Sequence, residues 1–125
     1  HKPQMSPPSF LSCDYKLHCL NSAKYIIEEN FVEPPTIKSL SRRIGINSNQ
    51  LKIGFKHMFG TTIRQYVIHL RLQHAQHLIL NTQLPFGIIS NKVGYTNHGH
   101  FSKLYKGKYG LSPLNERRCR GSLEK

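Results

Sequence analysis

Residues 46–60, INSNQLKIGFKHMFG, hold the pattern that decides the fold. Apolar residues recur at the spacing of one buried helix face, at Leu51, Phe55, Met58 and Phe59. Gly60 follows as a helix stop. The opposite face would carry amide, basic and apolar side chains, at Asn49, Gln50, Lys52, Ile53 and Lys56. Such a face can be an ordinary solvated surface, or it can enter a DNA groove, where lysines, amides and an isoleucine all have partners.

A shorter helix is predicted directly before this one. Thr36 is a suitable N-cap, apolar residues follow at helical spacing, and Gly45 is suitable as the stop. Asn47 or Ser48 can cap the next helix, so the turn between the two is only about three residues long. Two short helices joined by a tight, glycine-containing turn define a helix-turn-helix.

Helical periodicity continues through the rest of the chain. Further helices are predicted over 12–30, 61–81, 85–93, 97–109 and 112–118, with Ile88, Ile89 and Val93 facing inward in the third of these. The sequence thus predicts an all-α fold of about seven helices. At ~1.5 Å per residue, the segment 61–81 would be a connecting rod of roughly 30 Å.

The two halves of the chain repeat one another. A set of glycine, apolar and hydroxyl positions recurs at an offset of 49 and then 50, pairing Gly45, Leu51, Phe55, Phe59, Gly60 and Thr62 with Gly94, Phe101, Tyr105, Tyr109, Gly110 and Ser112. This indicates a duplicated, homeodomain-like unit: two helix-turn-helix subdomains joined by the long helix. Two reading helices about 34 Å apart would enter successive major grooves of an asymmetric site.

Composition favours a polyanionic partner. Eighteen Lys and Arg against six Asp and Glu give a net charge of +12 and a pI near 10.0. No apolar run approaches the ~20 residues of a membrane span. The cysteines, Cys13, Cys19 and Cys119, form no C-x-x-C pair, which fits a reducing compartment with Cys19 as a core residue.

The duplicated unit, the connecting helix and the closing Tyr109–Pro113 segment, YGLSP, resemble the AraC/XylS family of bacterial transcription regulators over about residues 15–118. The segment LKIGFKHMFGTT after Pro34-Pro35 is similar to members that control siderophore and iron-uptake genes. The resemblance implies cytoplasmic location, double-stranded promoter DNA as partner, contacts with RNA polymerase, and no membrane or cofactor. It also implies an N-terminal sensing or dimerisation domain, which agrees with a chain that starts at His1.

This organisation predicts a linker or arm at 1–11, a first subdomain at 12–60, the connecting helix at 61–81, a second subdomain at 82–118 and a tail at 119–125. In the first reading helix, amides suit adenine, lysines suit guanine and Ile53 suits a thymine methyl. The predicted base-reading residues are Asn49, Gln50, Lys52, Ile53 and Lys56 in the first half, and His98, His100, Ser102 and Lys103 in the second. Gly99 lets the backbone come close there, so this half is expected to discriminate bases less.

Phosphate contacts are expected from basic side chains and from helix N-termini. The predicted set is Thr36, Thr62, Arg64, Lys106 and Lys108, with further N-termini near Pro85 and Ser112. Neither the eight histidines nor the six acids form a pattern that predicts a metal or catalytic site. Two alternatives to a sequence-specific regulator remain: a basic, sequence-indifferent nucleic-acid-binding protein, and a repair-type enzyme module that uses a reactive cysteine.

Overall fold

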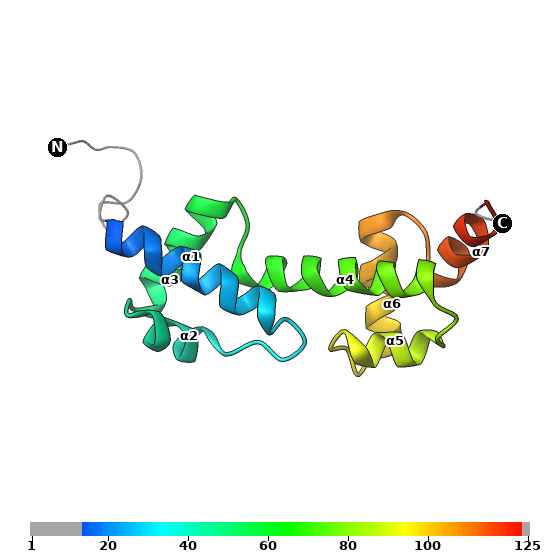
Figure 1. Ribbon diagram of the computed structural model, residues 1–125, viewed down its shortest axis with the longest axis horizontal. Coiled ribbons are helices and arrows are strands. Elements are labelled where there is room, and N and C mark those ends of the chain that lie inside the picture. Colours follow the sequence, from blue (N-terminus) through cyan, green and yellow to red (C-terminus); the bar gives the residue numbers. More distant parts are fainter. Residues whose placement is uncertain (1–13, 124–125) are drawn as a thin grey trace. The chain divides into compact units, whose positions relative to one another are not determined.

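The computed structural model describes residues 14–123, and these residues form seven helices and no strand (Figure 1). The helices are α1 (Asp14–Glu29), α2 (Ile37–Ile44), α3 (Ser48–Phe59), α4 (Ile63–Asn81), α5 (Phe86–Lys92), α6 (His98–Tyr109) and α7 (Pro113–Leu123). The predicted all-α fold of seven helices is confirmed. The arm predicted at 1–11 lies outside the described residues.

The chain divides into two compact units, His1–Val67 and Ile68–Lys125. The boundary falls inside α4, so the helix predicted as a separate connector contributes its first turn to unit 1 and its remainder to unit 2. The spacing of buried residues along α4 changes at this boundary. Val67 is followed after five residues by Leu72, and Ala75 and Ile79 follow at spacings of three and four. Leu72 was not among the residues predicted to be apolar contacts of this helix, but its side chain is 1% exposed.

Unit 1 contains α1, α2, α3 and the start of α4. Its core is formed by apolar residues of the first three helices, including Leu20, Ile27, Leu40, Leu51 and Phe55, each no more than 1% exposed. The caps are those expected from the sequence: the Thr36 hydroxyl accepts a hydrogen bond from the Ser39 amide at 3.0 Å, and Gly45 ends α2 with φ of 87°.

A polar contact links α1 to α4 within unit 1. The Tyr66 hydroxyl donates a hydrogen bond to Glu28, and Lys24 lies 3.3 Å from the same carboxylate. The hydrogen bond from Tyr66 is the largest cause that lowers the pKa of Glu28, whereas burial is the largest cause that raises the pKa of Tyr66 to about 12. The pair therefore stabilises the contact while Glu28 is ionised and Tyr66 is neutral.

Unit 2 has its own core of residues from α4, α5, the following turn and α6. The members are Leu72, Ala75, Ile79, Ile89, Val93, Tyr95, Phe101 and Tyr105. The prediction for Ile88 was wrong, because its side chain is 45% exposed while its neighbour Ile89 is fully buried. Ile89 and Val93, the C-cap residue of this seven-residue helix, already form the buried i, i+4 pair, and Ile88 points away from it.

The last helix is longer than the sequence predicted. α7 runs to Leu123 instead of ending near Arg118, so most of the expected tail at 119–125 is helical. Arg117 attaches it to the rest of unit 2: its Nε donates to the carbonyl of Ile79 and its Nη1 to that of Leu84, both at 2.9 Å. The same guanidinium lies 4.5 Å from the ring centre of Phe86.

The predicted repeat is confirmed in detail. Phe55 and Phe59 have ring centres 4.7 Å apart, and so do their counterparts Tyr105 and Tyr109. The closing glycines, Gly60 and Gly110, both adopt positive φ and both donate at 2.8 Å to the carbonyl four residues earlier. The change of offset from 49 to 50 comes from one additional residue in the second helix-turn-helix turn.

Candidate nucleic-acid interface

The first turn of α3 is closed by a capping box. Asn47 is the N-cap: its side chain accepts from the Gln50 amide at 2.8 Å, and the Gln50 side chain accepts from the Asn47 amide at 3.1 Å. This reciprocal capping box occupies the Gln50 carbonyl oxygen, which a bidentate contact to adenine would also need. Gln50 was predicted to read bases, but in the structure its side chain caps the helix.

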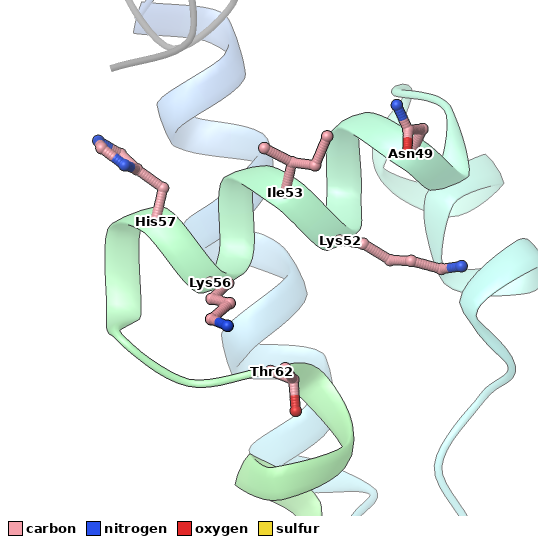
Figure 2. Close-up of a pocket in the computed structure, with 6 residues that line it drawn as sticks. All are labelled: Asn49, Lys52, Ile53, Lys56, His57 and Thr62. Carbon is pink, nitrogen blue, oxygen red and sulfur yellow. The ribbon is translucent and has the colours of Figure 1, made fainter. Parts of the chain in front are cut away.

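The outward face of α3 carries the remaining predicted residues together. Asn49, Lys52, Ile53 and Lys56 are exposed, and they line one open hollow with His57 and Thr62 (Figure 2). Figure 2 shows Asn49, Ile53 and His57 projecting in a row along the helix, with Lys52 and Lys56 beside them. Ile53 is 46% exposed, so an isoleucine does face solvent on this basic surface.

His57 was not among the predicted base-reading residues. His57 follows Ile53 by four residues, as Ile53 follows Asn49, and this spacing keeps the three side chains on the same side of the helix. Its neighbours Met58 and Phe59 were predicted to lie on the buried face. Both are only partly buried, whereas His57 is fully part of the exposed face.

The second reading helix, α6, begins with the same type of cap. The Asn97 side chain accepts from the His100 amide at 2.9 Å. The predicted residues His98, His100, Ser102 and Lys103 are all exposed. His98 also lies against α5, since a Cβ atom placed on Gly87 would come within 3.0 Å of its ring.

A tyrosine in the turn before α6 lies beside His100. Tyr95, only 7% exposed, has its ring centre 5.9 Å from that of His100 and 4.9 Å from the guanidinium carbon of Arg71. Arg71 and His100 therefore contact one buried tyrosine ring in unit 2, from α4 and α6 respectively. Tyr95 occupies the place that the buried Ile46 has in unit 1.

The predicted phosphate-binding residues lie at helix ends. Thr62 accepts from the Gln65 amide at 3.1 Å at the start of α4, and Arg64 is exposed in the same turn. Lys106 and Lys108 are exposed in the last turn of α6, where positive charge is also favoured by the helix dipole. Burial is the largest cause that lowers the pKa of His69 on α4, and the charge of Lys108 lowers it further.

The repeat relates two residues that the sequence analysis had given different roles. Lys56 and Lys106 are 50 residues apart, both exposed, and both accept the closing glycine amide with their carbonyl at 2.8 Å. Equivalent positions favour the same role for both lysines, and the role predicted for Lys106 is phosphate binding. In Figure 2 Lys56 points toward Thr62, another predicted phosphate contact.

Among the described residues, no group of three or more potential metal ligands comes together. The rings of His74 and His77 stack with their centres 6.5 Å apart, but the two histidines are not part of such a group. No helix in residues 14–123 combines the length and apolar character needed to cross a bilayer.

Comparison with known proteins agrees with this geometry. A family model described as a helix-turn-helix domain matches residues 40–118. The chain is 31% identical over 97 residues to the uncharacterized HTH-type transcriptional regulator YisR of Bacillus subtilis, covering 78% of this chain and 33% of that protein. It is 28% identical over 101 residues to the HTH-type transcriptional regulator ArgR of Pseudomonas aeruginosa, covering 81% of this chain and 31% of that protein.

A solved AraC-type DNA-binding transcriptional regulator from Chromobacterium violaceum superposes with a TM-score of 0.76 at 28% identity, covering 86% of this chain and 96% of that one. The fold and its exposed reading helices therefore define a helix-turn-helix DNA-binding domain. The chain belongs to this family, as a domain of the AraC type. It spans about a third of the length of the curated relatives that it matches.

Proposed function

We propose that this chain binds a specific sequence in double-stranded promoter DNA as part of a bacterial transcription regulator. The observation that carries the proposal is the outward face of α3. Exposed lysines, an asparagine and an isoleucine share one side of a capped helix inside a helix-turn-helix. Lysine can donate to guanine, asparagine can pair with adenine, and isoleucine can contact a thymine methyl group.

The second unit supports an asymmetric target. Its reading helix repeats the caps of α3 but carries a different outward set. Two different reading helices on one chain would recognise two different boxes, each in its own major groove and about one helical turn apart. Lys56, Lys106, Lys108, Arg64 and the capped helix N-termini would hold the phosphates on either side.

The whole regulator is proposed to contain an N-terminal sensing or dimerisation domain and to contact RNA polymerase, most simply as an activator. The family likeness supports this, as does the share of the relatives' length that this chain covers. Promoter DNA as the proposed partner supports a cytoplasmic location. The similarity of LKIGFKHMFGTT to siderophore and iron-uptake regulators makes the promoters of such genes the proposed targets.

A sequence-indifferent nucleic-acid-binding protein is the second candidate, because a net charge of +12 would by itself hold phosphate. An enzymatic role has no support in the arrangement of the described side chains. Binding to DNA alone would not distinguish the two candidates, since both predict it. Base preference does distinguish them.

The test is a selection from a randomised pool of duplexes of about 30 base pairs near 0.15 M salt. Enrichment of an asymmetric motif with two boxes about one helical turn apart is the expected result. Binding without enrichment, with affinity that falls steeply as salt is raised, would instead establish the sequence-indifferent function.

A further inference from the structure

Helix α6 carries two glycines that neither its backbone nor its packing requires. Gly99 lies in the first turn and Gly107 in the last, and both are exposed. Neither has the positive φ found at the helix-closing glycines Gly60 and Gly110. A side chain would therefore meet no backbone strain at either position.

Space is available at both positions. A Cβ atom on Gly99 would approach only the Asn97 side-chain oxygen, at 3.4 Å, and one on Gly107 would have no neighbour within 4 Å. Glycine is the least favourable helix residue after proline. The fold of unit 2 would accept alanine at both sites and would gain helix stability from it.

The repeat shows which residues α3 has at the equivalent positions. With an offset of 50 residues, Gly99 and Gly107 correspond to Asn49 and His57 of α3. Both helices have 12 residues, an asparagine N-cap and a glycine C-cap in the left-handed conformation. The row that reads Asn49, Ile53 and His57 in α3 (Figure 2) therefore reads Gly99, Lys103 and Gly107 in α6.

We propose that this row, from Gly99 through Lys103 to Gly107, is a close-contact surface for the sugar-phosphate backbone of DNA. The inference rests on the proposed function and names how the second reading helix carries it out. A helix surface without Cβ atoms lets a ligand approach the main chain more closely. The sugar-phosphate backbones of the two DNA strands that border a groove would contact Gly99 and Gly107. Lys103 is the one side chain of the row that would enter the groove between these two strands.

The two reading helices would therefore contribute differently to DNA binding. The row in α3 presents an amide, an apolar side chain and an imidazole, which distinguish bases. The row in α6 presents main chain and one lysine, which hold the duplex and fix its position. Most base preference would then map to the box contacted by α3, and much of the affinity would come from α6.

The test compares Gly99→Ala, Gly107→Ala and the double variant with the unchanged chain. Each variant is assayed for Tm, for affinity to the duplex obtained from the randomised pool, and for affinity to a scrambled duplex. Asn21→Ala, on the exposed side of α1, is the matched control, because it also raises helix propensity but lies outside both reading helices.

We expect each glycine variant to keep or raise Tm and yet to lose affinity for both duplexes, by about tenfold or more in the double variant. Asn21→Ala should raise Tm without loss of affinity. Unchanged affinity in the glycine variants would overturn the inference, whether or not the duplex pool has yielded a motif. A pool without any enriched motif would instead refute the proposed function, so the two failures are distinguishable.

Discussion

The hydroxyl of Tyr105 donates a 2.5 Å hydrogen bond to the carboxyl group of Glu116, and both side chains are almost completely buried. At an offset of 50, these two residues stand where unit 1 has Phe55 and Tyr66, whose ring centres lie 5.9 Å apart. The aromatic pair that joins two helices in unit 1 is thus replaced in unit 2 by a hydroxyl and a carboxyl group. The amide of Gln76 donates to the same carboxyl group at 3.3 Å.

This pair gives a first prediction about stability. Tyr105→Phe should lower the free energy of unfolding by about 1–3 kcal/mol, because it takes a hydrogen-bond donor from a buried carboxyl group. Combining Tyr105→Phe with Glu116→Tyr, which introduces the side chains of unit 1, should recover part of that loss. Urea unfolding measures both effects, with Tyr25→Phe, at an exposed position of α1, as the control. Strictly additive losses in the double variant would show that the two positions are not coupled.

A second prediction concerns pH and the contact between Tyr66 and Glu28. The pKa of Glu28 is lowered by folding, so its contribution is complete above its ordinary value of 4.5 and is lost as pH falls. The pKa of Tyr66 is raised to about 12, so its contribution is complete below 10.0 and is lost as pH rises through that range. Tyr66→Phe should therefore cost most stability between these limits and progressively less outside them. A stability difference that does not change with pH would contradict the assignment.

Lys52 and Lys106 test the division between base reading and phosphate binding. Lys52→Ala should cost roughly 1–3 kcal/mol on the selected duplex and should relax preference at one position. Lys106→Ala should weaken binding to every sequence alike and reduce the salt slope by about 1. Competition binding against single-base variants, repeated at several salt concentrations, separates the two patterns. Lys56→Ala should behave like Lys106→Ala, since the repeat gives the two lysines equivalent positions.

The predicted contact between Ile53 and a thymine methyl group can be tested by modifying the DNA. If its exposed side chain contacts a thymine methyl group, replacing each thymine of the first box in turn by deoxyuridine should weaken binding at one position. The expected loss is about 1 kcal/mol, the scale of one buried methyl or methylene group. The same replacement should have no effect on Ile53→Ala, which has already lost the contact. Equal sensitivity in both proteins would assign the effect to DNA shape instead of to Ile53.

Arg117 provides a prediction for unit 2 alone. Its guanidinium caps two carbonyl groups near the end of α4 and lies over Phe86, which lysine cannot reproduce with a single amine. Arg117→Lys should destabilise unit 2 and increase amide hydrogen exchange in α7, while exchange in α1 to α3 stays unchanged. Faster exchange in both units would show that Arg117 supports the whole chain.

Much of this fold could be predicted because each helix end is determined by residues close to it in the sequence. Thr36, Asn47 and Asn97 cap helices, and Gly45, Gly60 and Gly110 close them, as their sequence context indicates. Local signals failed where two adjacent positions compete for the core, as at Ile88 and Ile89. They also failed at Leu72, where the chain passes from one unit to the next and the spacing of buried residues changes.

The candidate site was predictable to the extent that it follows helix periodicity. The exposed faces of α3 and α6 follow from the apolar faces opposite them, and His57 could have been found by the same spacing. The capping role of Gln50 competes with base reading, and only the observed hydrogen bonds reveal it. Contacts such as Tyr66 with Glu28 join residues 38 apart in the chain, which no local pattern encodes.

The unit boundary inside α4 has a consequence for how the domain unfolds. Only five residues of the helix, from Ile63 to Val67, belong to unit 1, too few to persist as a helix without tertiary support. If unit 1 melts first, this turn should fray while the following fourteen residues stay anchored by Leu72, Ala75 and Ile79. Denaturation would then proceed in two steps, and a single midpoint would describe neither unit.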